Sequence, residues 1–225
     1  VAEMLVRQDD VNVIAMKDKK YIFSVGDEAY EMYEKSPDNI QVVFPMKHGV
    51  IAHFDDMQYL LGNLLQTDRQ FVRGSEYVIA VPTDVTEVEK KAFYDLVFHS
   101  EAKAKSVRIV ERGLADAVGF GLNIMDEKGV FIANFGGGTT ELSVLSYGGI
   151  VLNRLVKIGG EHFDKAVSSL VRHNRDFLIG RLTDERLRRE FGVFGQDTGS
   201  IRKVYGRDLA PGEPYQTYIR INSVE

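Results

Sequence analysis

One stretch decides the fold of this chain: residues 130–146, with the sequence VFIANFGGGTTELSVLS. Its first six residues have the β-branched and aromatic content of a buried strand. The run from Thr140 to Leu145 alternates polar and apolar residues, which predicts a second strand with one buried face. Two such runs joined by a short glycine-bearing loop predict a hairpin.

The loop of this hairpin has three consecutive glycines, more than a turn needs. Glycines leave backbone N–H groups uncovered by side chains, and a run of N–H groups forms a concave anion site. Thr139 and Thr140 add hydroxyls that can hydrogen-bond phosphate oxygens. The loop therefore suggests a phosphate site, and a flexible surface turn is the alternative that these residues leave open.

The flanking sequence alternates strands and helices, which indicates an α/β domain. We expect strands covered on both faces at 77–81 and 107–110. We expect helices at 111–122 and at 86–100, where Thr86 and Glu89 form a capping box. After the hairpin we expect a strand at 150–158, a helix opened by Gly159-Gly160-Glu161 and a helix at 185–191 capped by Thr183 and Asp184. The N-terminal part predicts strands at 11–16, 21–25 and 41–44, a helix at 26–33 with Asp27 as N-cap, and an amphipathic helix at 54–65. The alternation at 218–221 predicts a further short strand.

Composition limits the function classes. The chain has 225 residues with a formal net charge of -5 and a pI of about 5.6, which argues against binding nucleic acid through general positive charge. It has no cysteine, so a disulfide framework and thiolate metal sites are excluded. No apolar run has the length of a membrane span.

Several motifs in one order resemble the MreB family of bacterial actin homologues, within the superfamily of actin, sugar kinases and heat-shock-chaperone ATPases. PMKHGVIAHF at 45–54 is similar to the family's PMKDGVIADF, AVPTDVTEVEKKA at 80–92 to VPxxxTxVEKRA, and NFGGGTTE at 134–141 to DIGGGTTE. The likeness continues through 148–151, 158–166 and 178–188, and covers most of the chain from about Asp10 to Gly206.

The resemblance implies an α/β, actin-like (ribonuclease H-like) fold of mixed sheets flanked by helices, incomplete relative to the full two-domain fold. Residues 1–122 would be a portion of the first domain, with a small insertion subdomain at about 21–67, and residues 123–225 a portion of the second. The family's first phosphate loop and its second adenosine loop have no counterpart here. An excised middle portion and a reduced, divergent relative both remain open.

The resemblance also implies a site for ATP with magnesium. In the family the glycine hairpin holds the nucleotide phosphates and a later segment lies by the adenosine. These cofactor-binding roles are carried onto Gly136, Gly137, Gly138, Thr139, Thr140, Gly159, Glu185 and Arg188. For Glu185 and Arg188 the alternative is a solvated i,i+3 pair on a helix face.

Two departures from the family pattern bear on catalysis. The family's hairpin begins with an aspartate near the magnesium, where this chain has Asn134, a weaker magnesium partner. Arg112 stands where the family has the glutamate that positions the attacking water, and an arginine cannot accept a proton. We therefore assign no catalytic residue and no metal ligand, and whether the chain is an ATPase stays open.

Two functions remain from this resemblance. The first is a nucleotide-binding, filament-forming cytoskeletal protein of cell-shape determination, cytoplasmic and at the inner face of the membrane, with weak or absent ATP hydrolysis. The second is a non-catalytic actin-like scaffold that binds a partner and has lost nucleotide function. The expected partners are copies of the chain itself and cell-shape or membrane-associated proteins. Phe71-Val72 and the region from Tyr21 to Tyr33 are expected near subunit contacts, with core packing as the alternative.

Overall fold

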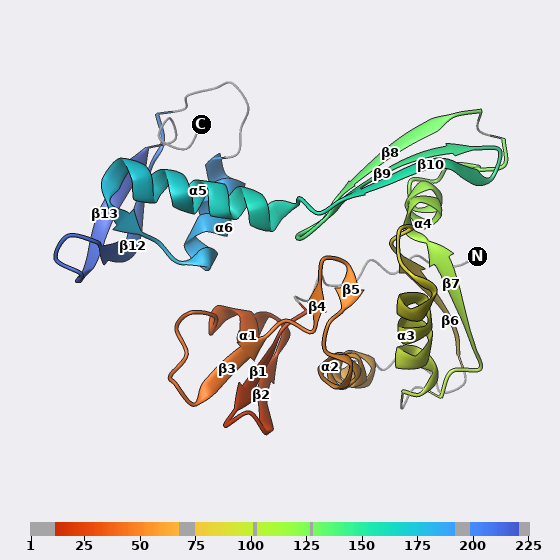
Figure 1. Ribbon diagram of the computed structural model, residues 1–225, viewed down its shortest axis with the longest axis horizontal. Helices are drawn as coiled ribbons and strands as arrows, with labels where there is room; N and C mark the ends of the chain where they lie inside the picture. Colours follow the sequence, from red (N-terminus) through yellow and green to blue (C-terminus); the bar gives the residue numbers. More distant parts are fainter. Residues whose placement is uncertain (1–11, 68–74, 101–102, 127, 192–198, 221–225) are drawn as a thin grey trace. The chain divides into compact units, whose positions relative to one another are not determined.

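The computed structural model describes residues 12–67, 75–100, 103–126, 128–191 and 199–220 (Figure 1). The chain forms two compact units: residues 1–134 with 141–155, and residues 135–140 with 156–225. The assignment of residues 1–122 and 123–225 to two actin-like domain portions stays a prediction. In the described ranges, no helix is both long enough and apolar enough to span a membrane.

The first unit begins with an antiparallel sheet in the order β2-β1-β3. Its strands are β1 (Ile14–Lys17), β2 (Tyr21–Val25) and β3 (Ile40–Val43). One face of this sheet packs against helix α2 (Phe54–Thr67) through Ile14, and the other packs against the short helix α1 (Gly26–Glu31) through Ala15. These elements lie close to the predicted ranges because their periodicity is local.

The predicted N-cap of α1 is wrong. The N-cap position belongs to Val25, which makes no side-chain cap bond, and Asp27 lies inside the first turn. The N-cap thus lies two residues earlier than predicted. Gly26, the first residue of the helix, adopts a left-handed backbone with φ of 65° and donates its N–H to the carbonyl of Val13 at 2.9 Å.

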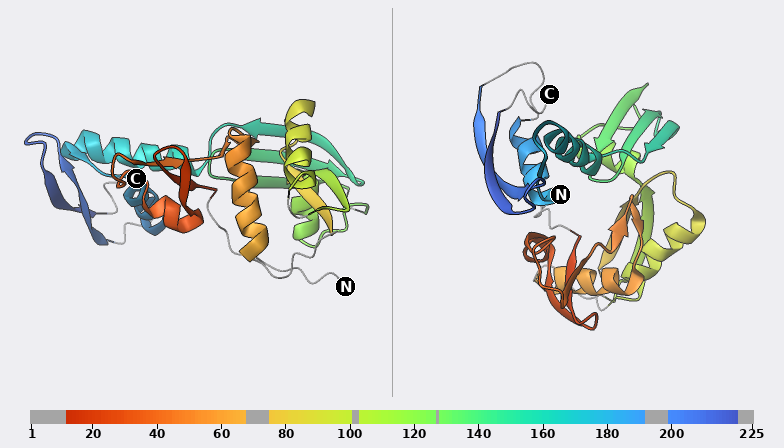
Figure 2. Two further views of the ribbon diagram at one scale, coloured as in Figure 1. Left: turned by 90° about the horizontal axis from the view of Figure 1, so that it is seen from below. Right: turned by 60° about the vertical axis from the view of Figure 1, so that its left-hand side comes forward.

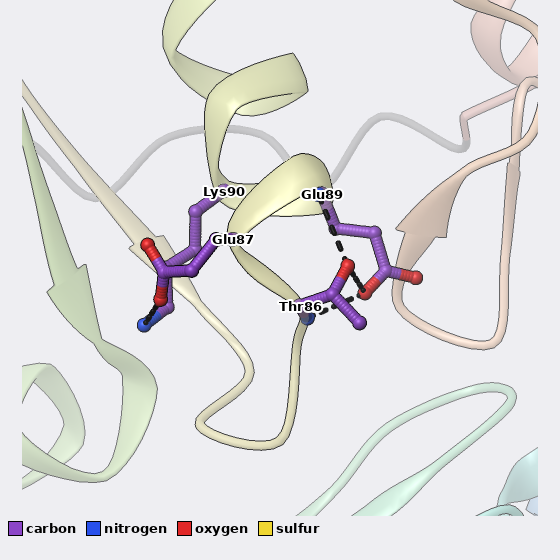
Figure 3. A network of polar contacts seen from close by, with 4 residues as sticks. All are labelled: Thr86, Glu87, Glu89 and Lys90. Atoms are coloured by element: carbon purple, nitrogen blue, oxygen red, sulfur yellow. Dashed lines mark hydrogen bonds and ion pairs between the residues drawn. The ribbon is translucent and has the colours of Figure 1, made fainter.

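A parallel strand pair follows, β6 (Glu76–Val81) with β7 (Ser106–Glu111), after the two-residue strands β4 (Met46–Lys47) and β5 (Val50–Ile51). Helix α3 (Glu87–Phe98) packs against this pair through Phe93. Figure 3 shows the capping box at its start, where Thr86 Oγ1 accepts from the N–H of Glu89 and the Glu89 carboxylate accepts from the N–H of Thr86. In the same turn, the hydrogen bond to Glu87 raises the pKa of Lys90 above its ordinary value.

The expectation that 77–81 is covered on both faces is wrong. Val81 is fully buried, but the side chain of Val78 is 66% exposed and burial alternates along β6. One face of the strand packs against α3, and among the described residues nothing covers the side chain of Val78 on the other face.

Three strands form the next sheet, in the order β10-β9-β8 (Figures 1 and 2). They are β8 (Val130–Phe135), β9 (Thr140–Ser146) and β10 (Gly149–Val156), and helix α4 (Arg112–Gly119) packs against them through Ala117, Ile132 and Leu145. The hairpin is thus as predicted. The burial is not: the polar residues Glu141 and Ser143 are buried, with 2% and 1% exposure, whereas Phe131 is 66% exposed.

The second unit packs two helices against a small antiparallel sheet in the order β11-β12-β13 (Figure 2). Its elements are α5 (Gly160–Arg175), β11 (Phe177–Leu178), α6 (Arg181–Phe191), β12 (Ile201–Asp208) and β13 (Pro214–Arg220). The core comprises Val167, Val171, Phe177, Ile179, Leu187, Val204 and Ile219.

Two expectations about this unit need correction. Helix α6 begins at Arg181, not Glu185, because the carbonyl of Gly180 accepts the N–H groups of Thr183 and Asp184 and so starts the helix a turn earlier. The strand at the end of the chain is longer than 218–221 and pairs along its whole length with β12, which the sequence pattern did not predict.

Candidate functional site

The glycine loop is fastened to the start of helix α5. Gly136 donates its N–H to the carbonyl of Thr139 at 2.8 Å, which closes the turn between β8 and β9. The carbonyls of Gly136 and Gly137 accept the N–H groups of Gly160 at 3.0 Å and Glu161 at 2.8 Å. These are among the first amides of α5, which have no partner inside the helix. The loop and the helix N-terminus are therefore one hydrogen-bonded substructure.

Gly159 makes this close approach possible. A Cβ atom at Gly159 would lie 2.5 Å from the carbonyl oxygen of Gly136, 2.7 Å from that of Gly137 and 2.8 Å from the nitrogen of Thr139. All three are backbone atoms, so no side chain fits there without moving the loop. Gly137 is the opposite case, because it is exposed and no heavy atom lies within 4 Å of the place where its Cβ would be. The loop thus has open space beside Gly137, while half-buried Gly138 follows it.

The two threonines of the loop are buried, with 5% exposure for Thr139 and 9% for Thr140. Thr140 donates its hydroxyl hydrogen to the carbonyl of Ile158 at 2.7 Å. Its hydroxyl therefore connects the end of the loop to the segment before α5.

Of the two predicted adenosine-side residues, Arg188 lies beside the start of α5. Its Nε donates to Asp164 Oδ1 at 2.5 Å, and its Nη2 would lie 3.3 Å from a Cβ on Gly160. Glu185 pairs instead with Arg189, at 2.6 Å between Oε1 and Nη2. The printed ion pairs thus join Arg188 to Asp164 and Glu185 to Arg189, and the side chain of Arg188 lies next to Gly160, which is hydrogen-bonded to the loop.

A buried carboxylate that sequence reasoning did not single out follows the loop in the first unit. Glu141 Oε1 accepts from the N–H of Thr83 at 3.0 Å and from Asn153 Nδ2 at 2.9 Å. Its Oε2 is buried without a hydrogen bond among the described atoms, and the nearest cation is Arg112, with Nη1 at 3.9 Å. Arg112 is thus the counter-ion of Glu141. The alternation of β9 offered no signal, since a glutamate in that pattern is expected on the solvent side.

The neutral amide of Asn134 is hydrogen-bonded to a carboxylate. Its Nδ2 donates to Asp116 Oδ2 at 2.7 Å. Asp116 lies on α4 one turn after Arg112, so i,i+4 spacing directs the two side chains to the same side of the helix. Position 134 itself has no carboxylate, but a carboxylate from α4 is hydrogen-bonded to it.

The predicted contact segments are only partly described. Tyr21 and Phe23 are exposed, by 68% and 54%, whereas Tyr30 packs into the core. Phe71 and Val72 lie outside the described residues.

The sheets flanked by helices, with a glycine hairpin hydrogen-bonded to a helix N-terminus, form an actin-like fold. The structure superposes with a TM-score of 0.88 on crystal structures of MreB5 of Spiroplasma citri bound to ADP and to AMPPNP, at 30% identity over 96% of this chain and 65% of theirs. It also matches the MamK double helical filament with a TM-score of 0.74 at 16% identity, a likeness of fold alone.

The family model described as MreB/Mbl protein matches residues 3–225. The cell shape-determining protein MreB of Escherichia coli K12 is 35% identical over 91% of this chain, and the cell shape-determining protein Mbl of Bacillus subtilis 168 is 29% identical over 96%. The chain belongs to the MreB/Mbl family. It spans about 60% of the length of that Escherichia coli relative and 66% of the Bacillus subtilis one.

Proposed function

We propose that the chain is part of a nucleotide-binding, filament-forming, actin-like protein of bacterial cell-shape determination, with weak or absent ATP hydrolysis. It would work in the cytoplasm, at the inner face of the membrane, with itself and with cell-shape or membrane-associated proteins as partners. Support comes from relatives named for cell-shape determination and from the ADP- and AMPPNP-bound structures of MreB5. ATP would favour the polymer-competent state through its differential affinity for that state.

The observation that carries the proposal is the loop held open beside Gly137. Its carbonyls are engaged by α5, its conformation is fixed by the close contact at Gly159, and no side chain fills the space next to Gly137. A preorganised run of backbone amides suits phosphate because it donates hydrogen bonds without ordering a flexible segment. We propose Gly136, Gly137, Gly138 and Thr139 as the phosphate-binding loop, with Thr140 and Gly159 holding it and Arg188 and Glu185 toward the nucleoside.

Gly137→Val should weaken ATP binding at least about tenfold, because isopropyl methyls would occupy the space proposed for phosphate while the loss of several charge-assisted hydrogen bonds costs more than 1.4 kcal/mol. Calorimetric titration of the chain with ATP and Mg²⁺ measures this. Gly129→Val is the matched control, since Gly129 also has no heavy atom within 4 Å of its Cβ position but precedes β8 outside the loop. Equal affinity in both variants and the wild type would exclude the loop as the phosphate site.

Magnesium is the metal ion expected with ATP. The described residues contain no group of three or more His, Asp or Glu side chains that could hold a metal alone. Mg²⁺ is usually held by one or two carboxylates together with waters and substrate phosphates, so a large protein cage is not required. We propose that magnesium enters with ATP, held mainly by the nucleotide phosphates and by water, where it would screen the phosphate charge.

We propose weak or absent hydrolysis because Arg112 stands where the family resemblance places the glutamate that positions the attacking water. A guanidinium cannot accept a proton from water, and this one lies beside the buried carboxylate of Glu141. The same residue supports the second candidate, a scaffold without nucleotide function. The ATP titration separates the two: saturable binding that depends on Gly137 supports the nucleotide-dependent filament, and no binding supports the scaffold.

A further inference from the structure

The outer face of the β12–β13 hairpin is basic and aromatic. Val204 and Ile219 are buried against α5 and α6, so the residues that alternate with them point away from the helices. The register pairs Lys203 with Tyr218 and Ile201 with Arg220, which places side chains of both strands on this outer side. We call it the basic face and define it by Lys203, Tyr205, Arg207, Tyr218 and Arg220.

This face concentrates positive charge on a chain whose formal net charge is -5. Tyr205 and Tyr218 are 64% and 60% exposed, and Lys203 Nζ lies 5.2 Å from the centre of the Tyr205 ring. Among the described residues no carboxylate forms an ion pair with Lys203, Arg207 or Arg220. Tyrosines and arginines exposed together are typical of protein contact surfaces rather than of plain solvated surface.

The first unit presents a surface of opposite charge. Asp27, Glu28 and Glu31 are exposed on α1, and positions i, i+1 and i+4 lie on one side of a helix. Ile22 packs toward α2, so its neighbour Tyr21 points to the other side of the sheet, where α1 lies. We call this the acidic face and define it by Tyr21, Asp27, Glu28 and Glu31.

We propose that the basic face of one copy of this chain docks onto the acidic face of a second copy. Each face combines three like charges with at least one exposed aromatic ring, so a contact would pair opposite charges and place cations over rings. Both halves of the contact are in the same chain, which favours a second copy over a different partner. Two unlike faces form a heterologous contact, and such contacts propagate into open assemblies unless they close into a ring. The inference rests on the proposed filament-forming function and specifies a surface for it.

Charge reversal with rescue tests the contact. The basic-face variant is Lys203→Glu, Arg207→Glu and Arg220→Glu, and the acidic-face variant is Asp27→Lys, Glu28→Lys and Glu31→Lys. Each should raise the concentration needed for association roughly tenfold or more, because like charges then meet. The combined six-fold variant should recover association. Sedimentation velocity with ATP and Mg²⁺ measures this at about 0.1 M and about 1 M salt, where the screening length falls from about 10 Å to about 3 Å and the wild type should weaken.

The control reverses three other exposed cations, with Lys128, Lys157 and Lys165 changed to Glu, and should associate like the wild type. Thermal unfolding checks that each variant folds, and glutamine at the three basic positions gives a milder variant that should also weaken association.

Assembly that is normal in both face variants would overturn this contact but leave the filament proposal intact. Absence of assembly in the wild type would overturn both. A combined variant that fails to recover would show that the two faces do not meet each other, and a salt effect independent of protein concentration would place the contact within one chain.

Discussion

Gly159→Ala should destabilise the second unit by about 2 kcal/mol, although it adds a single methyl group. The new Cβ would lie 2.5 to 2.8 Å from three backbone atoms of the glycine loop, and backbone cannot move aside as a flexible side chain can. Overpacking of this kind typically costs about 1 to 3 kcal/mol. Urea unfolding followed by circular dichroism measures the change, and ATP affinity should fall with it because the loop is displaced from α5.

The neighbouring glycine provides a matched control. A Cβ at Gly160 would meet the end of the Arg188 side chain at 3.3 Å and no backbone atom closer than the 3.8 Å of Gly137 Cα. Alanine also favours a helix over glycine by about 1 kcal/mol, which offsets the displacement of Arg188. Gly160→Ala should therefore unfold within about 0.5 kcal/mol of the wild type. Equal effects at the two positions would contradict the close packing of the loop on α5.

Glu141→Ala should destabilise the first unit by about 3 kcal/mol, because it removes a buried acceptor from three groups at once. The N–H of Thr83 and the amide of Asn153 lose their hydrogen-bond acceptor, and Arg112 loses its counter-ion. Glu141→Gln keeps one acceptor oxygen and should cost less. Thermal and urea unfolding of the two variants order these effects.

Glu190→Ala is the contrasting variant. Its ion pair with Arg202 is shorter, 2.6 Å against 3.9 Å for Glu141 and Arg112, but its side chain is 34% exposed and that of Arg202 is 51% exposed. Exposed pairs contribute at most about 1 kcal/mol, so this variant should cost less than Glu141→Ala despite the shorter distance. If Glu190→Ala proved the more damaging of the two, burial would not control the energetics of these pairs.

Elements with local signals could be predicted from the sequence. The capping box, a motif of only four residues from Thr86 to Glu89, specifies where α3 starts. The glycine hairpin is predicted by two apolar runs and the loop between them. The family resemblance, carried by ordered motifs, gave the actin-like fold.

Features that depend on distant contacts could not be predicted. Strand β12 has no pattern of its own, and its partner β13 determines it. Glu141 is buried because Thr83 and Asn153, 58 and 12 residues away, satisfy its carboxylate. The hydrogen bond between Asn134 and Asp116 joins residues 18 positions apart, so neither sequence motif alone indicated that the Asp116 carboxylate lies beside position 134. The roles of Arg188 and Glu185 stay predictions, although their ion-pair partners are now known.

The hydrogen bonds between the glycine loop and α5 mean that a movement of the loop would tilt the helix. It has 16 residues and is therefore about 24 Å long, so a tilt of about 10° at the loop moves its far end by about 4 Å. Asp164 and Glu161 couple this motion to α6 through Arg188 and Arg181. At the far end, the carbonyl of Asp176 accepts the N–H of Leu209, the residue after β12. A small displacement of the three glycines would thus produce a larger displacement of the sheet that has the basic face.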